Sequence, residues 1–266
     1  MLPPPTDPNE CFPTVGEREN EFHYYHFFPQ ISLMATIIEI VSRREVVQPF
    51  VLSYFANILV YYFGYYSFPL FYRTDRQRAW ILTLLSALVT GFGASPLFME
   101  FVSLPPDGNI SQIPGLNGPN ANAVSIFFMG YLFADLSLGM AHYPRQIHPV
   151  SGWIHHTGYL LVILNGLKYE FPGAFLCFAS ILEIPTICLA LGHINKAWRQ
   201  DYLFGFLFFV TRILLHAYVV HHAFVTYQSN YWMVTAIPYP IHVWWFINWL
   251  RQQMRLKSQS NTKKSN

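Results

Sequence analysis

The sequence predicts an all-α, polytopic membrane protein of about seven transmembrane helices, and its composition is the first reason. Hydrophobic residues make up 53% of the chain, whereas charged residues make up only 11%. Soluble domains carry about 25% charged residues, which their water-facing surfaces require. A bilayer removes that requirement because its interior is itself apolar. The distribution is the second reason, since long apolar stretches alternate with short charged or Pro- and Gly-rich segments.

The apolar stretches define the expected elements. Each of the seven has about the 20 residues that a helix needs to cross about 30 Å of hydrocarbon. A shorter apolar segment, 27–41, ends at Glu39, Arg43 and Arg44 and is expected to lie at the membrane interface. The expected spanning helices are Pro49–Phe71, Ala79–Met99, Ala121–Ala141, Val150–Leu167, Phe171–Gly192, Tyr202–Tyr227 and Tyr231–Leu250.

The basic residues predict the orientation of these helices. Alternate connections together with the C-terminal tail hold 11 Lys and Arg residues, and the connections on the opposite side hold 4. The side with more basic residues is normally cytoplasmic. Residues 258–266 are therefore expected to form a cytosolic tail, and residues 1–45 a lumenal segment that contains the interfacial helix.

Two short motifs agree with this orientation. Asn109-Ile110-Ser111 is an N-glycosylation sequon, and Asn109 falls in a connection that the topology places outside the cytosol. The chain ends Lys263-Lys264-Ser265-Asn266, which is similar to the dilysine signal of endoplasmic reticulum membrane proteins. A multi-pass protein of the endoplasmic reticulum membrane is the expected location.

Ionisable residues inside the expected spans are the strongest functional signal. They are Asp135, the pair His155 and His156, Glu183 and Arg212, on four different helices. Each costs at least about 2.5–3.5 kcal/mol in a bilayer interior unless it faces protein or water. At 1.5 Å per residue, all of them lie roughly 9–16 Å from the cytosolic ends of their helices. We therefore expect them to line one cavity in the cytosolic half of the bundle.

The two adjacent histidines cannot have the same orientation. Consecutive helical side chains project about 100° apart, so only one can point squarely into the cavity. Tyr159 lies one turn beyond His155, so His155 is assigned to the cavity and His156 to an orienting contact with Asp135 or Glu183. Five further polar residues share a helix face with one of the ionisable groups and are expected to line or support the cavity: Tyr131, His142, Tyr159, Ser180 and His216.

A purely structural role is the alternative for this polar layer. Arg212 would then neutralise Glu183 or Asp135 directly, and the histidines would tie helices together by hydrogen bonds. His193 and His242 lack a partner charge in the sequence and are expected to be solvated or interfacial.

The order of these motifs resembles a known membrane module. An Asp in one helix, then Trp153-Ile154-His155-His156-Thr157-Gly158-Tyr159, then Glu183-Ile184-Pro185-Thr186 and Arg212 is similar to the TLC domain, which TRAM proteins and ceramide synthases share. The resemblance covers residues 72–257 and leaves 46–71 as an extra preceding helix. It implies a ring of six helices that encloses a cavity for lipid.

The resemblance also implies the function. The Glu-x-Pro segment at Glu183 is nearer to TLC-domain-only proteins, whose roles lie in lipid homeostasis, and membrane lipids, sphingolipids among them, are the expected partners. The alternative is acyl transfer of the ceramide synthase type, with acyl-CoA as substrate, no cofactor, and His155, His156, Asp135 and Glu183 as catalytic candidates. Imidazole suits this chemistry because it titrates near neutrality. Tyr159 and Glu183, however, depart from the synthase pattern.

Other classes fit the sequence less well. Membrane di-iron oxygenases need histidine boxes on one helix face, and the histidine spacings here match none of them, so no metal is expected. A net charge of +2 without a basic cluster speaks against nucleic acid. A scaffold without a lipid cavity remains a further alternative, and the sequence leaves the oligomeric state open.

Overall fold

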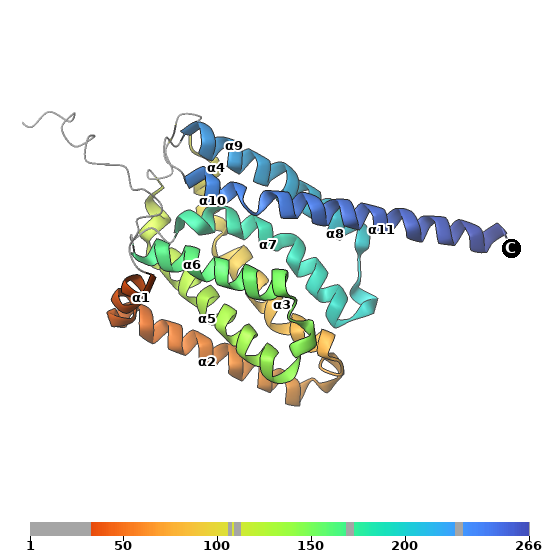
Figure 1. The fold of residues 1–266 in the computed structure, drawn as a ribbon, viewed down its shortest axis with the longest axis horizontal. Coiled ribbons are helices and arrows are strands. Elements are labelled where there is room, and N and C mark those ends of the chain that lie inside the picture. The colour runs from red at the N-terminus through yellow and green to blue at the C-terminus, as the bar shows by residue number, and fades with distance from the viewer. Residues whose placement is uncertain (1–32, 106–107, 109–112, 169–172, 227–230, 266) are drawn as a thin grey trace, which may run out of the picture.

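The computed structural model describes residues 33–105, 108, 113–168, 173–226 and 231–265, and within them every regular element is helical (Figure 1). This confirms the expected all-α class. Two short π-helical turns, Pro149–Ile154 and Phe209–Leu215, interrupt the α-helices. The α-helices are α1 Leu33–Ser42, α2 Arg44–Ser67, α3 Asp75–Gly93, α4 Ser95–Val102, α5 Pro119–His142, α6 His155–Lys168, α7 Gly173–Ile194, α8 Asp201–Phe208, α9 His216–Thr226, α10 Tyr231–Ala236 and α11 Tyr239–Ser265.

Three helical segments are long and apolar enough to cross a membrane: Arg44–Ser67, Pro119–His142 and Asp201–Val225, the last of which includes the π-turn. The pair α3 and α4 counts as a fourth span if it is taken together, although it bends by 42°. These spans support a membrane protein, and the full number of seven stays a prediction. Of the other expected spans, Val150–Leu167 and Tyr231–Leu250 are interrupted, whereas the expected Phe171–Gly192 corresponds to the continuous helix α7.

Two expected helices are broken at identifiable residues. The expected helix Ala79–Met99 divides at Ala94, and Ser95-Pro96 opens the next helix, where a proline at the first turn costs no hydrogen bond. The expected helix Tyr231–Leu250 divides at Pro238, which has no backbone N–H to donate. Beyond Leu250, α11 continues to Ser265 and extends out of the bundle (Figure 1).

Helices α3, α5 and α7 form the centre of the bundle, and α2 covers the outer side of α5 (Figure 1). A glycine makes the α2–α5 contact close. A Cβ atom at Gly130 would overlap Ser53 Oγ and would lie 2.9 Å from the backbone N of Tyr54. Small residues allow such backbone approach between membrane helices.

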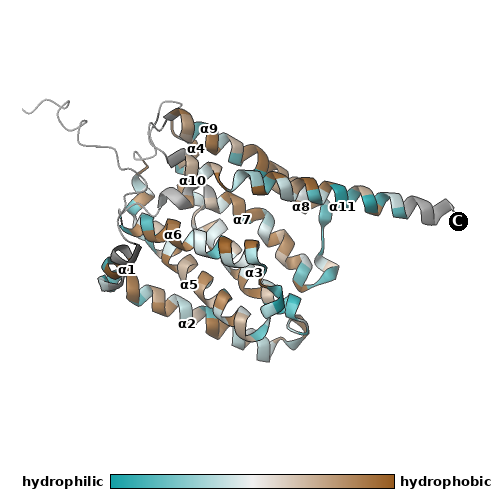
Figure 2. Cartoon of the chain, in the orientation of Figure 1, coloured by the Kyte–Doolittle hydropathy of each residue, from teal (hydrophilic) through white to brown (hydrophobic). Residues whose placement is uncertain are grey.

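The outer surface of the bundle is apolar where lipid is expected. On α2, the side chains of Leu52, Phe55, Leu59 and Phe63 are 56–70% exposed. Figure 2 shows hydrophobic residues along the bundle helices, and hydrophilic residues around the start of α3 and along the protruding part of α11. Such exposed apolar area would be a liability in water and is normal against lipid tails.

Helix α1 falls within the expected interfacial segment and packs on α2 and α6. Arg43 donates to the backbone carbonyl of Leu167 at 3.2 Å, and Lys168 Nζ lies 3.8 Å from a carboxylate oxygen of Glu39. These contacts tie α1 to the end of α6. The part of the expected segment that precedes Leu33 lies outside the described residues.

Candidate functional site

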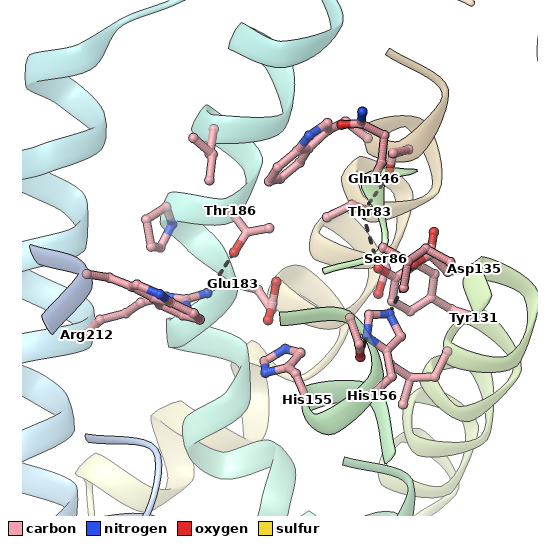
Figure 3. Close-up of a pocket in the computed structure, with 18 of the residues that line it drawn as sticks. Thr83, Ser86, Tyr131, Asp135, Gln146, His155, His156, Glu183, Thr186 and Arg212 are labelled. Atoms are coloured by element: carbon pink, nitrogen blue, oxygen red, sulfur yellow. Dashed lines mark hydrogen bonds and ion pairs between the residues drawn. The ribbon is translucent and has the colours of Figure 1, made fainter. Parts of the chain in front are cut away.

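A cavity of about 350 Å³ lies inside the bundle, among α3, α5, α6, α7, the π-turn 209–215 and α11. It lies near the end where α3 begins, α5 ends and α7 ends, which is the end that carries most of the basic connections. Apolar and aromatic side chains form much of its wall. The polar side chains that line it are Thr83, Ser86, Tyr131, Asp135, Tyr143, Gln146, His155, His156, Glu183, Thr186 and Arg212 (Figure 3).

All the ionisable residues singled out within the sequence reach this cavity. Asp135 comes from α5, His155 and His156 from the start of α6, Glu183 from α7 and Arg212 from the π-turn 209–215. The geometry thus brings together groups that are up to 77 residues apart in the chain. What each of them does depends on its partners.

Asp135 and His156 form a buried pair. Nε2 of His156 lies 3.1 Å from Oδ2 of Asp135, and the Tyr143 hydroxyl donates to Oδ1 at 2.9 Å. Nδ1 of His156 lies 2.8 Å from the carbonyl oxygen of Gly152. This carbonyl can only accept, so Nδ1 of His156 carries a proton. Nε2 of His156 therefore faces the Asp135 carboxylate within ion-pair distance.

His155 has a different environment from its neighbour. Its ring lies edge-on to Tyr159, with 4.2 Å between the ring centroids, and it makes no hydrogen bond to another described residue. Both imidazoles line the cavity, but only His156 contacts Asp135. His155 is therefore the imidazole whose nitrogens are available to a ligand.

Arg212 is held in the cavity wall by neutral acceptors. Its Nε donates to the backbone carbonyl of Leu182 at 2.9 Å, one terminal nitrogen donates to Thr186 Oγ1 at 2.8 Å, and the other lies 3.3 Å from Nε2 of His242. In the part of the chain that the structure describes, no carboxylate lies within ion-pair distance of its guanidinium. Direct neutralisation of Glu183 or Asp135, as the structural alternative requires, is therefore not what the geometry shows.

His242 extends this arrangement, and the expectation of a solvated or interfacial His242 is wrong. Arg212 only donates, so Nε2 of His242 accepts and its Nδ1 carries the proton. Nδ1 of His242 lies 3.0 Å from Nδ1 of His216, and Nε2 of His216 lies 2.7 Å from the carbonyl oxygen of Thr235. Each group in this chain has one consistent role, with both imidazoles neutral. His242 and His216 thus fix the position of Arg212 from behind.

The remaining candidate residues lie around the cavity or away from it. His142 does not share the cavity face of Asp135, because its Nε2 lies 2.7 Å from the hydroxyl of Tyr62 on α2. Ser180 is buried in α7 and Tyr159 packs against His155 and Phe128, so both support the wall without lining it. Asn109 lies outside the described residues.

Sequence reasoning missed several polar residues of the wall. Ser86 is 2% exposed, and its hydroxyl has no hydrogen-bond partner among the described side chains and backbone. Thr83 bonds the hydroxyl of Tyr131 at 3.3 Å. Serine and threonine hydroxyls can be placed in a membrane helix at a small free-energy cost. The sequence therefore does not distinguish Ser86 and Thr83 from the other serines and threonines.

Both π-helical turns border the cavity. Pro149–Ile154 contains Gly152 and leads directly into His155, and Phe209–Leu215 contains Arg212. Such turns insert a residue into a helix and re-aim the side chains that follow, and they occur frequently at functional sites. They explain how two otherwise ordinary apolar helices present polar groups to one space.

Together, the apolar bundle and the polar groups around its cavity define a helical membrane protein with an internal cavity. A family model for the TLC domain matches residues 79–252. The chain belongs to the TLC domain family. No curated protein and no solved structure matches the chain.

Proposed function

We propose that this protein binds a membrane lipid in the cavity and acts in lipid homeostasis. The observation that carries the proposal is a cavity with polar groups in its wall, inside a bundle whose outer surface is apolar. Its volume of about 350 Å³ lies at the lower end of the range for small-molecule sites. That size suits the headgroup of a lipid and the adjoining part of one chain.

The wall of the cavity supports an amphiphilic ligand. The cavity is lined by histidine, carboxylate and guanidinium groups and also by the aromatic side chains of Phe208, Trp245, Phe246 and Trp249. A lipid carries both kinds of surface in one molecule. Membership of the TLC domain family agrees with a lipid-related role.

The endoplasmic reticulum, with a cytosolic C-terminus, is the proposed location. The asymmetry of the basic residues and the terminal Lys263-Lys264 support it. The cavity would then lie in the cytosolic half of the membrane. A glycosylation reporter fused to the C-terminus should stay unmodified, and a glycosylated reporter would contradict this topology.

Acyl transfer from acyl-CoA is the second candidate function, and the imidazole of His155, which lines the cavity without a hydrogen bond to another described residue, favours it. His155 could act as a base or acyl acceptor, with His156 and Asp135 beside it as a paired imidazole and carboxylate. His155→Ala and His156→Ala should then each abolish acyl-CoA consumption while the protein stays folded. If both variants keep full activity in a lipid assay, the pair has no chemical role, and lipid binding alone remains.

Analysis of co-purified lipids tests the principal proposal. The wild-type protein should carry one lipid class enriched over the surrounding membrane. Ala79→Trp places a bulky ring in the cavity wall and should reduce that bound lipid severalfold. Ala141→Trp, at an exposed position of α5 outside the cavity wall, is the matched control and should leave it unchanged. A co-purified lipid composition that equals the bulk membrane in all three proteins would contradict the proposal.

A further inference from the structure

The two opposite charges of the cavity have partners that do not neutralise them. Arg212 is 9% exposed and bonded to a carbonyl, a hydroxyl and a neutral imidazole. Glu183 lines the same cavity and has no ion-pair partner among the residues that the structure describes. Buried charges are normally paired. This cavity therefore offers one positive and one negative group to a ligand.

Arg212 has N–H donors left with which to bind an anion. A guanidinium has five N–H donors, and the three bonds to Leu182, Thr186 and His242 use three of them, which leaves two. These bonds come from two other helices and hold the planar group in a single orientation. Two donors on a fixed guanidinium match the oxygens of a phosphate group.

Glu183 selects for a cation near that anion. In Figure 3 its carboxylate lies in the same space as Arg212 and His155. A ligand with negative charge alone would meet repulsion from Glu183, and a ligand with positive charge alone would meet repulsion from Arg212. A ligand that carries both charges meets neither. The other carboxylate of the cavity, Asp135, already has two partners, His156 and Tyr143.

Ser86 and His155 indicate the kind of cation. The Ser86 hydroxyl is buried, lines the cavity and has no partner within the described chain, and the His155 nitrogens are equally unbonded. These atoms and the carboxylate of Glu183 can all accept N–H bonds. A primary ammonium donates three such bonds, whereas a quaternary ammonium donates none.

We propose that the ligand is a zwitterionic phospholipid whose phosphate binds Arg212 and whose primary amine faces Glu183. This inference rests on the proposed lipid-binding function and names the lipid class of that same cavity. It also makes Ser86 and His155 the acceptors for the amine.

A headgroup panel on the purified full-length protein tests this assignment. The probes are a phospholipid with a primary-amine headgroup, the matching phosphatidic acid, the matching diacylglycerol and a long-chain primary amine. Binding is measured by displacement of a fluorescent lipid analogue. The amine phospholipid should bind about tenfold or more tightly than each of the other three, which corresponds to one charge-assisted hydrogen bond.

Two substitutions should each remove one half of this selectivity. Arg212→Gln should abolish the preference over the long-chain amine, and Glu183→Gln should abolish the preference over phosphatidic acid. Arg199→Gln and Glu39→Gln change exposed residues outside the cavity and should leave the panel unchanged. If Arg212→Gln fails to fold, the wild-type panel and Glu183→Gln decide the question.

The outcomes distinguish a failure of the headgroup assignment from a failure of the proposed lipid-binding function. Lipid binding without headgroup preference, or tightest binding of the long-chain amine, would overturn the zwitterionic assignment and leave a lipid-binding protein. Binding of none of the four probes would overturn both. A preference that survives Glu183→Gln unchanged would also overturn the assignment.

Discussion

Replacing Asp135 with Ala is expected to lower the free energy of unfolding by about 3–5 kcal/mol. Asp135 is 9% exposed, and its carboxylate contacts both Nε2 of His156 and the hydroxyl of Tyr143. Alanine would leave both groups buried without a partner. Unfolding of the purified protein in mixed micelles measures the change.

Two further variants test whether the loss of stability in Asp135→Ala comes from the lost contacts of its carboxylate. Asp135→Asn should cost much less, about 1 kcal/mol, because its amide can donate to Nε2 of a neutral His156 and accept from Tyr143. Asp75→Ala removes a half-exposed carboxylate whose partner is Arg78 at 3.5 Å, and it should cost less than about 1 kcal/mol. If Asp135→Ala is no more destabilising than Asp75→Ala, the buried pair does not stabilise the fold.

Replacing Gly130 with Ala is expected to destabilise the α2–α5 contact by about 1–3 kcal/mol. The added methyl group would overlap the Ser53 side chain and press on the Tyr54 backbone, which cannot move without shifting α2. The measurement is again the free energy of unfolding.

Gly158→Ala is the matched control for the helix-propensity part of this substitution. A Cβ at Gly158 in α6 meets nothing within 4 Å. Alanine there should be neutral or stabilising by about 0.5–1 kcal/mol, because it favours helix. Equal effects at both glycines would show that α2 is not packed closely on α5.

The polar layer could be predicted from the sequence because burial in lipid makes charges conspicuous. Asp135, Glu183 and Arg212 stand out in apolar spans, and helix rise alone sets their depth. Their convergence on one cavity follows from the cost of any other location. The offset between His155 and His156 was predictable for the same geometric reason.

Partners and helix irregularities could not be predicted in the same way. No sequence pattern near His242 indicates a hydrogen bond to Arg212, which is 30 residues earlier in the chain. His142 has the i+7 spacing expected of the cavity face, but it lies at the last turn of α5, where Tyr62 of α2 is in reach. The π-turns shift the helical register, so periodicity alone misplaces residues that follow them.

Photo-crosslinking with a lipid tests the central claim most directly. A phospholipid that carries a photoreactive group in its acyl chain would be added to membranes containing the protein, and the labelled residues identified by mass spectrometry. The predicted result is labelling of cavity residues such as Leu189, Phe208 and Phe246, suppressed by excess unlabelled lipid. Labelling confined to the outer surface, at residues such as Leu59 and Phe63, and insensitive to competitor would contradict a lipid site inside the bundle.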